Sequence, residues 1–148
     1  MKKLFVIALS TFIIGAGTLA SCSKYAEGPN FSLQSKKSRV CNDWKLTDHI
    51  LNGNNIFDAS VTSKMSIDKD GTYSISNLTN ELGQLHGTYS HGTWKFGEDA
   101  TTLFFYADST TINPVHEYTI KELRNKRMVL EEEIFQTGDV HRVTFSQQ

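Results

Sequence analysis

The stretch TSKMSIDKDGTYSISN, residues 62–77, shows the pattern that sets the fold. Polar and apolar side chains alternate on both sides of Lys69-Asp70-Gly71, where the glycine supplies the positive φ that a tight hairpin needs. Alternation with a period of two residues is typical of strands that bury one face. The stretch therefore predicts two antiparallel strands, at about 62–68 and 71–77, joined by a short turn.

The same alternation recurs from Cys41 to Gln148, with turn residues spaced as in sandwiches and barrels. Six further strands are predicted at about 43–50, 89–96, 101–107, 115–122, 127–133 and 139–146. No apolar stripe of helical spacing runs for three turns in this part of the chain, so the domain is expected to be all-β. Pairing of the first strand with the last removes both sheet edges, which favours an eight-stranded up-and-down antiparallel barrel over a sandwich.

Several aromatic residues are expected in the interior of this barrel. They are Trp44, Phe57, Tyr73, Trp94, Phe96, Phe105, Tyr118 and Phe145. An eight-stranded barrel is just wide enough to be filled by its own side chains or to hold one small ligand. Two interpretations therefore stay open: a solid core, or a core that leaves a cavity. Cys41 is expected to be a small, half-buried residue beside Trp44.

The N-terminus has the layout of a secretory signal, with Lys2 and Lys3 before an apolar segment that runs to about Ala20. Leu19-Ala20-Ser21-Cys22 resembles the lipobox of bacterial lipoproteins. The resemblance implies that residues 1–21 are a signal peptide and that Cys22 becomes the lipidated N-terminus. It further implies a protein anchored by lipid in the outer membrane, facing either the periplasm or the cell surface.

Residues 22–40 are mostly polar and are predicted to form a lipidated tether ahead of the domain at 41–148. A short helix is predicted within residues 32–39, with Ser32 or Ser35 as its N-cap. Once Lys2 and Lys3 are removed with the signal, 13 basic residues remain against 16 acidic ones. Nucleic-acid binders carry concentrated basic patches, so no nucleic-acid partner is expected.

Four segments carry a further resemblance: Asn42-Asp43-Trp44-Lys45-Leu46, Asp68-Lys69-Asp70-Gly71-Thr72-Tyr73, Gly92-Thr93-Trp94-Lys95-Phe96 and Tyr118-Thr119-Ile120-Lys121-Glu122-Leu123. Together they resemble the lipocalin-like domains of lipoproteins from some Gram-negative bacteria. The resemblance implies that Trp44 plugs the closed end of the barrel. It also implies that a small hydrophobic molecule binds inside. The alternative is an interaction module with a solid core, whose loops at 78–88 or 108–114 contact another protein of the cell envelope.

Strand alternation suggests where such a ligand would be held. His116 shares a strand face with Tyr118 and Ile120, while Glu132 and His141 share faces with apolar residues of their own strands. These three side chains are candidates to line the mouth of the barrel and fix the polar end of a ligand. The competing interpretation is that they are solvated strand ends at the rim.

The segment at 78–87 is predicted to be a long loop between two strands, and long loops on a rigid barrel are often functional. Leu82 and Leu85 are candidates for a lid that contacts the ligand. The alternative is that they fold back on the barrel rim as a small satellite core.

No motif in the sequence predicts catalysis or a cofactor. Zinc sites usually take three or four ligands at fixed spacing, and neither an HxH nor a CxxC pair occurs. His86 and His91 are expected to be solvated loop residues. The chain is accordingly predicted not to be an enzyme and to hold no metal.

Overall fold

The computed structural model describes Tyr25 and residues 33–148, with the side chain of Glu81 excepted. Cys22 and the predicted signal peptide lie outside the described residues. In the described part, one helix, α1 (Lys36–Val40), precedes nine strands. These are β1 (Asp43–Leu51), β2 (Asn54–Asn55), β3 (Val61–Ile67), β4 (Thr72–Glu81), β5 (Gln84–Phe96), β6 (Thr102–Tyr106), β7 (His116–Leu123), β8 (Arg127–Ile134) and β9 (Asp139–Gln147). This helix is not long and apolar enough to cross a membrane.

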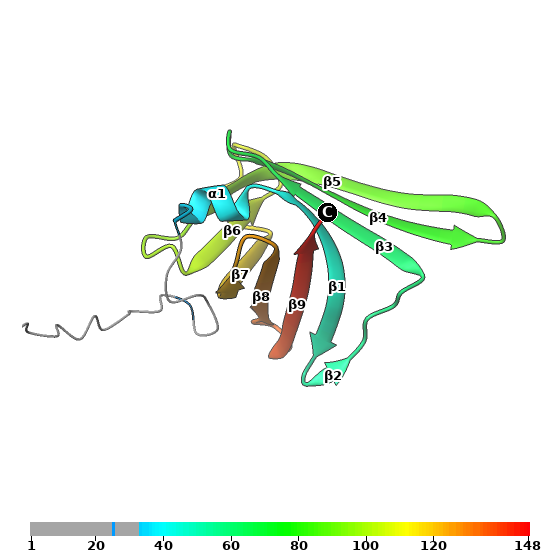
Figure 1. Ribbon diagram of the computed structural model, residues 1–148. Coiled ribbons are helices and arrows are strands. Elements are labelled where there is room, and N and C mark those ends of the chain that lie inside the picture. The colour runs from blue at the N-terminus through cyan, green and yellow to red at the C-terminus, as the bar shows by residue number, and fades with distance from the viewer. Residues whose placement is uncertain (1–24, 26–32) are drawn as a thin grey trace, which may run out of the picture.

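The strands pair antiparallel in the order β2-β1-β3-β4-β5-β6-β7-β8-β9, and β1 also pairs with β9 (Figure 1). β2 is a two-residue extension paired with the end of β1. The other eight strands form an up-and-down antiparallel barrel, which confirms the fold expected from the alternation.

One end of the barrel is closed by α1 and by Trp44, whose side chain is fully buried. The Trp44 Nε1–H donates to the backbone oxygen of Val40 at 2.8 Å, so the end of the helix is joined to the start of β1. Arg39 donates from Nη1 to the backbone oxygen of Leu123 at 2.5 Å and ties the helix to the end of β7. The predicted helix is confirmed, with the hydroxyl of Ser35 accepting from the backbone N–H of Ser38 at 3.0 Å as its N-cap.

Apolar side chains pack above this closed end into one core cluster. Its buried members include Trp44, Met65, Ile67, Tyr73, Trp94, Leu103, Phe105, Ile120, Leu123, Met128 and Leu130. Phe96, Tyr118 and Phe145 are partly buried against it, and so is Cys41, as expected. Phe57 is half-buried in the connection between β2 and β3 and is not among the residues packed against the cluster. The expectation of an interior position for Phe57 is therefore wrong.

The predicted loop at 78–87 is also wrong, because β4 and β5 continue through it as a paired hairpin. The pairing runs without interruption to Glu81 opposite Gln84. The turn is only Leu82-Gly83, with φ of 53° and 83°, respectively. The hairpin projects well beyond the rest of the barrel (Figure 1). His86 and His91 are exposed, as expected, but they lie in β5 and not in a loop.

Tyr25 packs against the closed end although it lies in the predicted tether. Its ring is 4 % exposed, and its hydroxyl donates to the backbone oxygen of Ala100 at 3.0 Å, in the turn between β5 and β6. The Lys36 ammonium of α1 lies 5.3 Å from the centre of the same ring. A residue only three positions after Cys22 is therefore packed against the barrel.

Replacing Trp44 by Ala should destabilise the domain by about 3–5 kcal/mol, because a fully buried ring is lost and a cavity remains. Urea denaturation followed by circular dichroism measures the change. The exposed neighbour Lys45 provides the matched control, and Lys45→Ala should change the free energy of unfolding by no more than about 0.5 kcal/mol. Equal stability of Trp44→Ala and the wild type would contradict the assignment of Trp44 as the plug.

Candidate functional site

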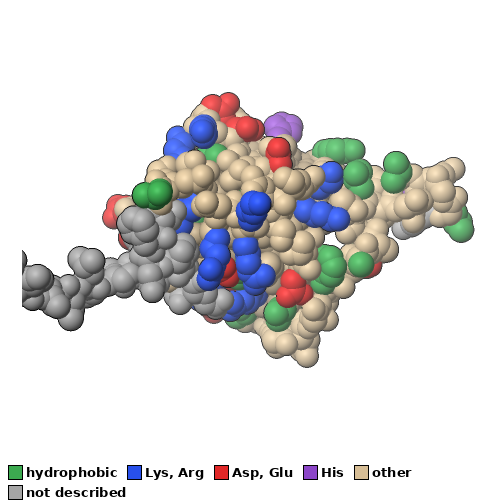
Figure 2. All heavy atoms as spheres, viewed as in Figure 1, with side chains coloured by type: hydrophobic (Ala, Val, Ile, Leu, Met, Phe, Trp, Pro, Cys, Tyr) green, Lys and Arg blue, Asp and Glu red, His purple; other side chains and the backbone are tan. Residues whose placement is uncertain are grey.

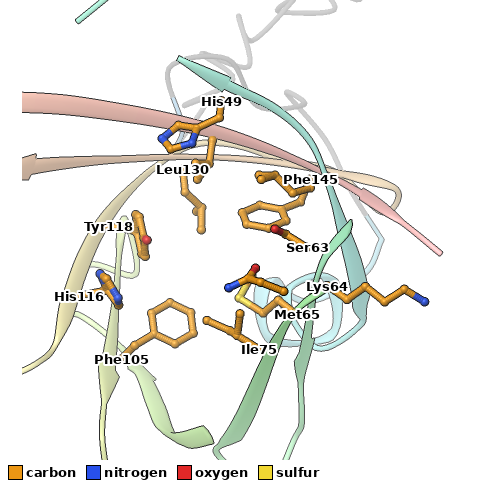
Figure 3. Close-up of a pocket in the computed structure, with 13 residues that line it drawn as sticks. His49, Ser63, Lys64, Met65, Ile75, Phe105, His116, Tyr118, Leu130 and Phe145 are labelled. Atoms are coloured by element: carbon orange, nitrogen blue, oxygen red, sulfur yellow. The ribbon is translucent and has the colours of Figure 1, made fainter. Parts of the chain in front are cut away.

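A cavity of about 300 Å³ lies inside the barrel, on the side of the core away from α1, and is partly open to solvent (Figure 3). β1, β3, β4, β6, β7, β8 and β9 contribute to its wall. The lining residues are Leu46, His49, Ser63, Lys64, Met65, Ile75, Asn77, Phe105, His116, Tyr118, Leu130, Val143 and Phe145. Most of these side chains are apolar, and the few polar ones can orient a ligand.

Aromatic contacts hold one wall of the cavity in place. The Phe105 ring packs edge-to-face against Tyr73, with 4.8 Å between ring centres, and against Tyr118 at 5.9 Å. His116 stacks on the other side of Tyr118 at 5.6 Å. Because each ring is supported by the next, this wall is preformed and need not be ordered by a ligand.

Glu132 and His116 form the central polar contact of the site. The Nδ1–H of His116 donates to the Glu132 carboxylate, at 3.0 Å from Oε1 and 3.2 Å from Oε2. The backbone N–H of Glu117 donates to Oε1 at 3.3 Å. The hydrogen bond to Glu132 raises the pKa of His116 above its ordinary value of 6.5, because it outweighs the opposing effect of burial. The Nε2 atom is left as the ring nitrogen that can meet a ligand.

Tyr118 is coupled to the same carboxylate. Burial is the main reason that the pKa of its hydroxyl is raised, and the negative charge of Glu132 and a hydrogen bond to it act in the same direction. Tyr118 therefore stays un-ionised at neutral pH and keeps its hydroxyl proton as a donor.

A second pair of histidines joins β1 to β9 beside the cavity. Nε2 of His49 lies 3.0 Å from Nδ1 of His141, so one ring nitrogen donates and the other accepts. Burial and the neighbouring His141 lower the pKa of His49, with Asp48 opposing them. His49 lines the cavity, whereas His141 stands behind it.

The structure thus brings together three of the residues suggested by alternation. His116 and Glu132 are in direct contact, and His141 pairs with Glu132 in the strand register. Of the three, His116 lines the cavity, whereas Glu132 and His141 do not. His49, which the sequence analysis missed, is the lining residue that His141 contacts. Whether these residues bind a ligand stays a prediction.

Leu82 and Leu85 are placed elsewhere, at the tip of the β4–β5 hairpin. Their side chains are 106 % and 73 % exposed, and neither lines the cavity. Hydrophobic side chains are visible along this projecting hairpin in Figure 2, and Tyr89 is exposed there as well. Both earlier interpretations, a lid and a satellite core on the rim, required a loop that folds over the barrel, and this hairpin does not.

Within the part of the chain that the structure describes, no group of three or more His, Cys, Asp or Glu side chains is arranged to hold a metal ion.

Comparison with known proteins identifies the fold. The structure resembles that of japanin from Rhipicephalus appendiculatus bound to cholesterol, with a TM-score of 0.52 and 13 % identity over 77 % of this chain and 79 % of japanin. This likeness shows a lipocalin-like barrel. The odorant-binding protein from bovine nasal mucosa matches at a TM-score of 0.45 and 10 % identity, over 80 % of this chain and 77 % of that protein. No family model and no curated protein matches the sequence.

Replacing Glu132 by Gln should lower the pKa of His116, because the carboxylate is the main cause of its elevation. In the wild type the folded-state pKa lies above the unfolded value. The contact therefore stabilises the fold fully below about pH 6.5, and this stabilisation is lost as the pH rises through the folded-state pKa. NMR titration of the imidazole protons measures the change in pKa.

The neighbouring Glu133 is exposed and gives a control of the same charge change. Glu133→Gln should leave the titration of His116 unaltered. An equal decrease in both variants would show a general charge effect in place of the specific contact.

Proposed function

We propose that this protein binds a small, mainly apolar molecule in the cavity of its lipocalin-like barrel and acts as a carrier or sensor for it. The observation that carries the proposal is the preformed cavity of about 300 Å³, apolar over most of its wall and partly open to solvent. Ligand pockets occupy about 300–1,000 Å³ and combine apolar walls with a few placed polar groups. The cavity lies at the lower end of that range, which favours a ligand with a single short chain or ring.

The comparison with japanin supports this proposal at the level of the fold. Japanin shares the barrel architecture and was solved with cholesterol bound. Lipocalin-like proteins are usually binding proteins without catalytic activity. The alternative of an interaction module with a solid core receives less support, since the interior is not completely filled.

Filling the cavity tests this function directly. Ser63 is half-buried in the cavity wall, where Figure 3 shows its hydroxyl directed inward. Ser63→Trp should weaken binding of the fluorescent probe N-phenyl-1-naphthylamine at least about ten-fold, because the indole takes the volume that the probe needs. Probe titration of the purified domain measures the effect.

Ser74 on β4 is exposed and does not line the cavity, so Ser74→Trp is the matched control and should bind the probe like the wild type. Undiminished probe binding by Ser63→Trp would argue against the cavity as the binding site.

We further propose that the domain is held at the outer membrane by lipid on Cys22, facing the periplasm or the cell surface. The support is the lipobox-like sequence Leu19-Ala20-Ser21-Cys22. The contact of Tyr25 with Ala100 also indicates how the domain would be oriented. Tyr25 is three residues after Cys22, and three residues span at most about 11 Å, so a lipid on Cys22 would be held close to this end of the barrel. The closed end would then lie next to the bilayer and the mouth of the cavity would face away from it.

Cys22→Ala should move the protein expressed in a Gram-negative host from the detergent phase to the aqueous phase in Triton X-114 partitioning, because stable anchoring depends on the acyl chains. Cys41→Ala changes the other cysteine and should leave the protein in the detergent phase. A wild-type protein found in the aqueous phase would exclude the anchor.

A further inference from the structure

The charges around the cavity decide which polar group a ligand can carry. Taking an isolated charge out of water costs far more than burying a hydroxyl or an amide that finds a hydrogen-bond partner. A charged ligand therefore needs an opposite charge that is directed into the cavity and not already paired.

The permanent cation in the lining does not serve this purpose. Lys64 contributes to the wall, but its side chain is exposed, and Figure 3 shows it running away from the cavity. On the neighbouring strands, Lys121 lies 2.8 Å from the Glu131 carboxylate and Arg142 lies 4.0 Å from it. Glu131 thus engages both of these cations.

The ionic groups of the His116–Glu132 pair compensate one another, with His116 in the cavity wall and Glu132 in contact with it. Glu132 is 9 % exposed and already accepts from His116 Nδ1 and from the backbone of Glu117. A protonated His116 balances its charge, and a neutral His116 leaves the site with a net negative charge. In neither state does the His116–Glu132 pair carry a surplus positive charge for an anion, and the buried carboxylate repels one. Nor does the pair attract a cation strongly when His116 is protonated.

The opposite wall carries uncharged polar groups. Ser63 on β3 and Asn77 on β4 are cross-strand partners in the register and both line the cavity. His49 is in contact with His141 and is kept neutral at neutral pH by burial and by that neighbour. Hydroxyl, amide and neutral imidazole groups donate to and accept from uncharged partners.

We propose that the ligand is uncharged, a small apolar molecule with an alcohol, ketone or amide head that hydrogen-bonds His116 on one wall and Ser63 or Asn77 on the other. This inference rests on the proposed function and names the class of ligand for the same cavity. It excludes fatty acids as preferred ligands at neutral pH.

Three probes of equal chain length test the assignment: octan-1-ol, octanoate and octylammonium at pH 7.5. At this pH the acid and the amine are ionised, so the three differ chiefly in the charge of the head group. Displacement of N-phenyl-1-naphthylamine from the wild-type domain gives the three affinities. Octan-1-ol should bind at least about ten-fold more tightly than octanoate, and octylammonium should not bind more tightly than octan-1-ol.

Glu132→Gln separates the effect of charge from that of shape. Where His116 is neutral in the wild type, removing the carboxylate should raise the affinity for octanoate by about three- to ten-fold. In either protonation state of His116 it should change the affinity for octan-1-ol by less than about three-fold. Glu133→Gln should change neither affinity. A wild type that binds octanoate or octylammonium more tightly than octan-1-ol would overturn the inference and leave the proposed function standing. Isothermal titration calorimetry detects binding of the three compounds without the fluorescent probe, and a wild-type domain that binds none of them would overturn both.

Discussion

The closed end of the barrel is the constraint on which the rest of the structure depends. Trp44 is fully buried and donates to the backbone of Val40, so β1 and α1 are fixed to one another at the point where the barrel begins. Arg39 adds a second tie, to the end of β7. Because one end is filled by these groups and the core above them, free volume is left toward the other end. The position of the cavity thus follows from the position of the plug.

Most of the fold could be predicted from the sequence because six of the seven connections between the long strands lie where the alternation breaks. Gly71 and Gly138 both have positive φ in these turns. The exception is the β4–β5 hairpin. Polar residues, glycine and scattered leucines in Leu78–Gly87 carry no regular alternation, so the sequence resembled a loop. Pairing of the two backbones, which does not require a buried face, keeps this segment extended.

Strand alternation predicted the positions of some residues of the candidate site and not of others. His116 and Glu132 keep the phase of their strands and could be placed on one face from the sequence. His49 could not, because a β-bulge between Leu46 and Asp48 shifts the register of β1. Strict alternation from Trp44 turns Asp48 inward, whereas the extra residue brings His49 to the cavity. A bulge depends on pairing between distant strands, so the sequence of β1 alone does not reveal it.

The projecting hairpin has a consequence for the behaviour of the protein in solution. β6 pairs with β5 only from Thr93 to Phe96, so in the described structure the outer backbone edge of residues 84–92 has no strand beside it. Proteins usually protect such edges with charged residues or proline, and Gln84–Gly92 contains neither Lys, Arg, Asp, Glu nor Pro. Leu85 and Tyr89 add exposed apolar surface to the same strand. This segment is therefore the part of the molecule most open to strand addition, and self-association at high concentration would begin there.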